Sequence, residues 1–117
     1  IKGDKFFFFF VKFEELYNYL LLKIDEIAER ILTLGHTPIH NYSEYKKISE
    51  IAESSQVADG IKAVSGILAS FKVIITLQRT LLALSGETGD EGTNALMSDY
   101  IRAQEKSVWM YSAFLKK

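Results

Sequence analysis

The apolar residues in the first third of the chain recur at helical spacing. On a helical wheel, which turns by about 100° per residue, one side collects a set of large apolar residues: Phe6, Phe9, Phe13, Leu16, Leu20, Ile24, Ile27 and Ile31. We interpret this set as a stripe that faces a core. With Asp4 as its N-cap and Gly35 as its C-terminal stop, the pattern predicts a first long helix over residues 4–34.

Three further helices are predicted, separated by connections that contain glycine or proline. Ser43 is expected to cap a short helix of about ten residues that runs through Glu50. A second long helix is predicted over residues 57–85, and a third over residues 90–114 with Asp90 as its cap. No alternating strand pattern of useful length remains. The pattern therefore predicts an all-α fold of three long helices and one short helix.

Composition narrows the class of protein. The chain has 117 residues, of which 48% are hydrophobic and 25% are charged, so we expect a single domain over residues 1–117. A net charge of −1 without a Lys/Arg run gives no reason to expect nucleic acid as a partner. The absence of cysteine excludes disulfides and Cys-ligated zinc. No apolar run approaches the roughly 20 residues of a membrane span, so no membrane contact is expected.

Five consecutive phenylalanines, Phe6 to Phe10, depart from an ordinary amphipathic helix. Five successive helical residues point in every direction, so they do not all face one core. Phe10 is expected on a flank that it shares with Glu14, Asp25 and Glu29. Phe8 is expected, together with Tyr19, on the polar side formed by Lys12, Glu15, Lys23, Glu26 and Arg30. These two aromatic residues therefore have no core to enter.

Segments spread over nearly the whole chain resemble the Dps family, the ferritin-like mini-ferritins that protect DNA in starved cells. These segments are IKGDKFF, KFEELY, IDEIAERILTLG, SEYKKISEI, GDEGTNALMSDYIR and EKSVWMYSAFL. The resemblance implies a cytoplasmic four-helix bundle with a short extra helix in its middle connection, assembled as a hollow dodecameric cage. Because the chain opens just after the segment that would supply the first bundle helix, we expect a ferritin-like bundle that lacks this helix.

The resemblance also implies a metal site that two subunits share. The family's activity would be oxidation of ferrous iron, usually by peroxide, with one His on the first bundle helix. The second helix would supply a His and acidic residues four, fifteen and nineteen positions later, which fall on Phe10, Glu14, Asp25 and Glu29. Oxygen donors suit Fe²⁺, but a phenyl ring has no lone pair to donate. We therefore expect weak or lost iron binding at Asp25, Glu29 and Glu14, we assign no catalytic residue, and ferroxidase activity stays open.

Several features have a simpler interpretation. Asp25, Glu26 and Glu29 could form a solvated face with a Glu26–Arg30 pair. His36 and His40 flank Pro38 and are interpreted as loop polarity rather than a metal site. The second long helix has an acid-free polar stripe, whose cations either meet acids on a neighbouring helix or belong to a redesigned contact: Lys62, Ser65, Lys72, Thr76, Arg79 and Thr80. The large residues of the last helix are expected in the core or at a subunit contact: Trp109, Met110, Tyr111 and Phe114.

Two functions follow as hypotheses. The first is a Dps-like scaffold for iron storage or detoxification with an impaired ferroxidase site, engineered by added aromatic residues to self-assemble. The alternative is a structural helical assembly module without iron chemistry. A bundle that lacks a helix exposes an apolar groove, which a second copy of this chain, a separately supplied helix or the first helix itself would cover. Both hypotheses predict a homo-oligomer. We expect Phe8, Tyr19 and Phe10 at the subunit interface.

Overall fold

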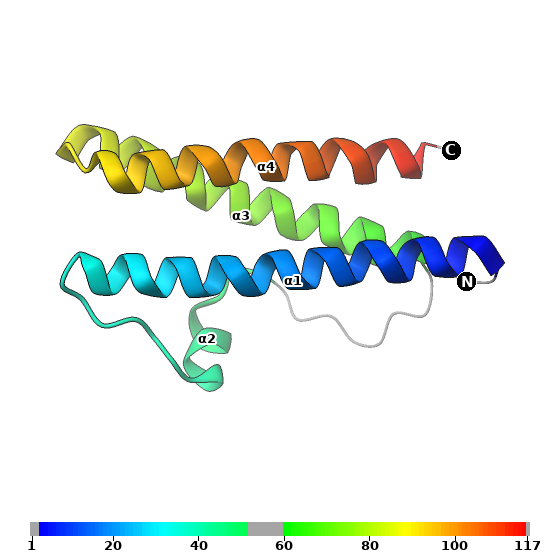
Figure 1. The fold of residues 1–117 in the computed structure, drawn as a ribbon, viewed down its shortest axis with the longest axis horizontal. Helices are drawn as coiled ribbons and strands as arrows, with labels where there is room; N and C mark the ends of the chain where they lie inside the picture. The colour runs from blue at the N-terminus through cyan, green and yellow to red at the C-terminus, as the bar shows by residue number, and fades with distance from the viewer. Residues whose placement is uncertain (1–2, 52–59, 117) are drawn as a thin grey trace. The chain divides into compact units, whose positions relative to one another are not determined.

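The computed structural model describes residues 3–51 and 60–116, with side chains from Phe8 onward. These residues form four helices and no strand (Figure 1): α1 (Gly3–Thr33), α2 (Tyr42–Ile48), α3 (Gly60–Thr88) and α4 (Glu91–Leu115). The prediction of three long helices and one short helix is confirmed. The chain divides into two compact units, Ile1–Ser49 and Glu50–Lys117.

Helix α1 ends where its sequence predicts. Gly35 has a φ of 89°, a left-handed conformation that glycine adopts without a side-chain clash. The His36 amide donates to the Ile31 carbonyl at 3.0 Å, and the Gly35 amide donates to the Leu32 carbonyl at 2.9 Å. These two bonds form a Schellman motif, which satisfies carbonyls at the end of the helix.

The start and the covered side of α1 differ from the prediction. The helix begins at Gly3, one residue before the expected cap, and the side chains of Asp4, Phe6 and Phe7 lie outside the described residues. Within the expected core stripe, Phe9 is buried, whereas Ile24 and Ile27 are exposed. A wheel gives the angle of each side chain but not which of these angles is buried. The placement of these two isoleucines in the core was therefore wrong.

Asn41, rather than Ser43, caps α2. The Asn41 side-chain oxygen accepts the Glu44 amide at 2.9 Å, and the Ser43 hydroxyl donates to the same oxygen at 3.1 Å. The helix has seven residues instead of about ten, because Ser49 adopts an extended conformation with ψ of 135°. Asparagine and serine are both favoured caps, so residue type alone does not distinguish them.

Helices α3 and α4 lie side by side and form a helical hairpin (Figure 1). Helix α3 continues to Thr88, three residues beyond the predicted end at Ser85. A Schellman motif forms there instead, with Gly89 at a φ of 75° and the Asp90 amide donating to the Ser85 carbonyl at 2.8 Å. The Asp90 carboxylate then accepts the Thr93 amide at 3.1 Å, which confirms Asp90 as the cap of α4.

Buried residues of this hairpin recur every seven positions along each helix. On α3 they include Val64, Phe71, Gln78 and Ser85, and on α4 they include Met97, Gln104 and Tyr111. A spacing of seven brings side chains to the same side after two turns. Each helix therefore presents one continuous side to the other.

Helix α3 departs from the expectation that no apolar segment approaches the length of a membrane span. It has 29 residues, and an 18-residue window within it has a mean hydropathy of 1.6 with 17% of the window buried. By length and composition alone, such a helix can cross a membrane. The core helix of a soluble protein meets the same criteria, so this one helix is weak support for a membrane span.

Candidate functional site

The three acidic residues expected to bind metal all lie on α1. Glu14, Asp25 and Glu29 are all exposed. Asp25 and Glu29 are one turn apart, about 6 Å along the axis, whereas Glu14 and Asp25 are three turns apart, about 16 Å. Among the described residues, no three His, Asp or Glu side chains are grouped so that they could hold a metal ion. One copy of α1 therefore does not bring these three carboxylates to one ion.

Phe10 lies one turn before Glu14, at the position where the family resemblance implies a histidine. Its ring is exposed and carries no atom that can coordinate a metal. The donors that α1 can offer on this side are carboxylate oxygens, which suit hard cations. The imidazole donor that would complete a mixed nitrogen and oxygen set for ferrous iron is missing at this position.

The two histidines are placed as loop residues. His36 and His40 are both exposed and lie in the connection between α1 and α2, outside any helix. They therefore do not form the one-turn pair that two histidines four residues apart make on a helix. Their interpretation as loop polarity agrees with this placement.

Phe8 and Tyr19 are packed more closely than the sequence predicts. The Lys12 ammonium lies 5.9 Å from the Phe8 ring centre, and the Lys23 ammonium lies 5.0 Å from the Tyr19 ring centre. Each lysine also pairs with a glutamate three residues later, Lys12 with Glu15 at 3.4 Å and Lys23 with Glu26 at 3.1 Å. Tyr19 is half-buried and Phe8 is 40% exposed.

The expectation that both rings stand on an open polar face was therefore wrong for Tyr19. Over each ring lies the ammonium group of a lysine one turn later, which the ring quadrupole attracts. The Phe8 ring also meets the Phe9 ring edge to face at a centroid distance of 5.9 Å. Whether these residues form a subunit interface stays a prediction.

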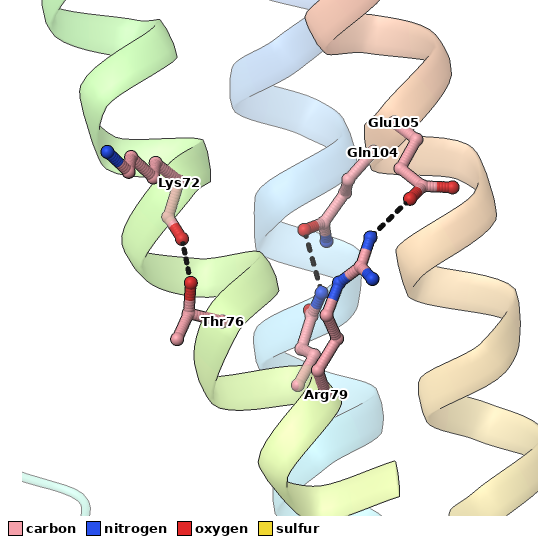
Figure 2. A network of polar contacts seen from close by, with 6 residues as sticks. Lys72, Thr76, Arg79, Gln104 and Glu105 are labelled. Atoms are coloured by element: carbon pink, nitrogen blue, oxygen red, sulfur yellow. Dashed lines mark hydrogen bonds and ion pairs between the residues drawn. The ribbon is translucent and has the colours of Figure 1, made fainter.

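Polar contacts join α3 and α4 at two successive positions (Figure 2). The Arg79 guanidinium pairs with the Glu105 carboxylate at 2.5 Å. Beside it, the Gln78 amide donates to the Gln104 amide oxygen at 3.0 Å, and both side chains are buried. Arg79, one of the cations in the polar stripe of α3, therefore pairs with an acid on α4. This pairing agrees with the first of the two interpretations of the stripe.

Sequence reasoning missed the buried glutamine pair. A signal was present, because Gln78 follows Phe71 by seven residues and Gln104 follows Met97 by seven. On the last helix, Tyr111 is buried, whereas Trp109 is 67% exposed. Trp109 is therefore not a core residue of this chain, and a subunit contact is the remaining expectation for it.

Comparison with known proteins places the whole chain in one family. The family model of the ferritin-like domain matches residues 1–117. An uncharacterised protein of Haemophilus influenzae is 50% identical over 97% of this chain and 71% of its own length. The DNA protection during starvation protein of Porphyromonas gingivalis is 38% identical over 97% of this chain and 71% of its own length.

A solved structure gives the same result. The crystal structure of a Dps protein from Vibrio cholerae O1, described as a member of a broad superfamily of ferritin-like diiron-carboxylate proteins, matches with a TM-score of 0.94. It is 53% identical and covers 98% of this chain and 72% of that chain. The apolar length of α3 is accordingly that of a ferritin-like helix. This chain belongs to the Dps family of mini-ferritins within the ferritin-like proteins.

Proposed function

We propose that this chain is a subunit of a Dps-type iron-storage or detoxification scaffold whose capacity to oxidise ferrous iron is impaired. The supporting observation is Phe10. A ferrous site of this family would need a nitrogen donor there, and a phenyl ring supplies none. Iron is both the substrate and the cargo of such a scaffold. Loss of a ligand at the oxidation site is therefore expected to impair the oxidation of iron more than the storage of iron.

The spacing of the acidic residues supports the same proposal. Because Glu14 lies about 16 Å along α1 from Asp25, a site that uses both needs a second copy of the helix. We propose that Glu14, Asp25 and Glu29 give at most weak binding of iron across such a pair. Carboxylates alone favour hard cations and discriminate poorly among divalent metals.

Stopped-flow absorbance after addition of Fe²⁺ and peroxide tests this proposal. We expect no oxidation phase that saturates at a fixed small number of irons per subunit. Phe10→His should recover part of such a phase, because it restores one imidazole beside Glu14. A phase that saturates in the parent chain and is abolished by Asp25→Ala would show that the site works and would overturn the proposal.

Homo-oligomerisation and an engineered origin belong to the same proposal. Aromatic residues at Phe8, Phe10 and Tyr19 stand among charged residues of α1, which is unusual for a helix that is meant only to face solvent. We propose that they were introduced to change subunit contacts. That this chain alone contacts neither nucleic acid nor a membrane also stays a prediction.

A structural assembly module without iron chemistry is the second candidate. The observation that favours it is the number of large apolar side chains that α1 exposes, among them Phe10, Val11, Tyr17 and Leu22. Exposed apolar surface of this extent marks interaction sites in soluble proteins. Assembly that survives Asp25→Ala and Phe10→His, with no iron retained by either variant or by the parent, would favour this candidate.

A further inference from the structure

Helix α4 carries a line of exposed residues on a side other than its buried one. Positions that alternate at spacings of four and three residues follow one line along a helix. On α4 such a line comprises eight residues, all exposed except the half-buried Ser112: Glu91, Ala95, Ser98, Arg102, Glu105, Trp109, Ser112 and Lys116. Lys116 is the C-cap and keeps a right-handed helical conformation, so it continues the line. We call this set the α4 line.

Trp109 is the one large apolar residue of the α4 line, and it is 67% exposed. Tryptophan is enriched at the centre of protein–protein contacts, where a partner covers its ring. The uncharged residues that share the line with Trp109 are all small, namely Ala95, Ser98 and Ser112. The α4 line therefore offers both a ring to be covered and the space to receive one.

The two central charges of the α4 line are paired within the chain but stay open to solvent. The Arg102 guanidinium lies 3.0 Å from the Asp99 carboxylate, and the Arg79 guanidinium of α3 lies 2.5 Å from the Glu105 carboxylate (Figure 2). The Arg102 side chain is 75% exposed and the Glu105 side chain is 52% exposed. Each of these two residues can therefore meet an opposite charge of a partner without leaving its own pair.

The α4 line is complementary to itself in the antiparallel direction. Its eight positions form four pairs that share a midpoint between residues 103 and 104, which are 91 with 116, 95 with 112, 98 with 109 and 102 with 105. Around a twofold axis at this midpoint, Glu91 meets the partner's Lys116, and Arg102 meets the partner's Glu105. Every charge of the line thus meets an opposite charge. A twofold interface needs this self-complementarity.

We propose that the α4 line binds the α4 line of a second copy of this chain in this antiparallel register. The Trp109 ring packs over the partner's Ser98, so the largest side chain of the line meets a small one. Ala95 lies against the partner's Ser112, which lets the two helices approach closely at both ends of the contact. Because the contact is isologous, each of these pairings occurs twice.

Other arrangements leave the charges of the line unmatched. A parallel pairing sets Arg102 against the partner's Arg102 and Glu105 against the partner's Glu105, which brings like charges together. An antiparallel shift by one heptad in either direction sets Arg102 against a serine and Glu105 against Ala95 or Trp109. A uniformly anionic partner, such as nucleic acid or an anionic lipid surface, would meet the carboxylates of Glu91 and Glu105 with like charge.

The inference deepens the homo-oligomer of the proposed function and does not depend on its iron chemistry. It adds a contact through α4 to the contacts proposed for the aromatic residues of α1. If the chain assembles but the α4 lines do not pair, the homo-oligomer stands and only this inference fails. The two proposals are therefore separated by measurement.

Cysteine cross-linking tests the register directly, because the chain has no cysteine of its own. A disulfide needs Cα atoms within about 7 Å of each other. In the proposed register, positions 95 and 112 of two chains meet, whereas two copies of position 95 lie about 26 Å apart along the helix axis. We expect disulfide-linked dimers when the Ala95→Cys and Ser112→Cys chains are co-expressed, and none from either variant alone.

Fluorescence gives a second test, because Trp109 is the only tryptophan of the chain. We expect the parent to emit at shorter wavelength than either Arg102→Glu or Glu105→Arg, since each variant sets like charges against each other and returns the ring to water. Co-expression of the two variants should restore the parent emission, because a mixed pair again joins opposite charges at both places. Lys62→Glu is the matched control, since Lys62 is exposed on α3 and outside the α4 line.

Three results would overturn the inference. They are the absence of cross-links between the co-expressed cysteine variants under oxidising conditions, dimers from the Ala95→Cys variant alone, and charge-reversal variants that emit as the parent does. A monomeric parent would overturn both this inference and the homo-oligomer. An assembled parent whose co-expressed cysteine variants do not cross-link would overturn the inference alone.

Discussion

Gln78 and Gln104 bury their side-chain amides between α3 and α4. Each amide needs a partner, because an unsatisfied buried amide costs about 1–3 kcal/mol. The 3.0 Å bond between them supplies that partner. The pair also favours one register of the hairpin, since sliding one helix past the other would separate the two amides.

We therefore expect Gln104→Ala to lower the free energy of unfolding by roughly 1–3 kcal/mol, because it leaves the Gln78 amide buried without its partner and removes packed volume. The double variant Gln78→Leu with Gln104→Leu should be close to neutral, since both polar groups are then removed. Urea unfolding at one fixed protein concentration measures both. A double variant as unstable as Gln104→Ala would contradict the role given to the hydrogen bond.

At the residue scale, chemistry was easier to predict than burial. The loss of a ligand at Phe10 follows from the residue type once the family position is known. The contact of the Lys23 ammonium with the Tyr19 ring does not, because a wheel does not show the rotamer of a lysine. The glutamine pair could have been found from its spacing of seven residues from Phe71 and Met97.

At the element scale, two glycines have opposite roles. Gly89 has a φ of 75° and ends α3, whereas Gly66 lies inside α3, where a Cβ atom would meet nothing within 4 Å. A left-handed conformation costs a residue with a side chain roughly 1–2 kcal/mol. Glycine inside a helix costs roughly 0.5–1 kcal/mol relative to alanine.

Gly66→Ala should accordingly raise the free energy of unfolding by roughly 0.5–1 kcal/mol, and Gly89→Ala should lower it by roughly 1–2 kcal/mol. Thermal unfolding followed by circular dichroism measures the two changes. The variants are matched controls, since each replaces one glycine of the same hairpin by alanine. Equal signs for the two would contradict the assigned roles.

The ends of elements were predicted well where one residue type has a physical reason to stand there. Gly35 supplies the left-handed residue at the end of α1, and Asp90 supplies the side-chain acceptor at the start of α4. The extension of α3 past Ser85 was missed, since Gly86 resembles a stop and the left-handed turn falls at Gly89 instead. The cap of α2 was placed two residues late, because Asn41 and Ser43 are both good caps.

At the scale of the whole molecule, the family and the helices could be predicted from the sequence, but the way in which copies assemble could not. A single chain exposes large apolar side chains on α1 and Trp109 on α4. Such residues gain free energy when they are buried, roughly 2 kcal/mol for each ring before the costs of association are subtracted. The number of copies depends on contacts between chains, and a single chain does not show these contacts.

Phe8 and Tyr19 lie eleven residues apart, on nearly the same side of α1 and about 16 Å apart along its axis. We expect the double variant Phe8→Glu with Tyr19→Asp to lower the sedimentation coefficient, because it introduces charge where we propose that chains meet. Tyr42→Ala is the matched control, since Tyr42 is an exposed aromatic residue outside α1. An unchanged coefficient in the double variant would remove these two residues from the interface.

The mass of the parent chain in solution tests the central claim of a self-assembling Dps-type scaffold most directly. Sedimentation velocity and equilibrium on the untagged protein give this mass without any substitution. The account predicts an assembly that contains two or more copies of the 13.3 kDa chain and that persists on dilution. A species that remains at 13.3 kDa at every concentration would contradict it.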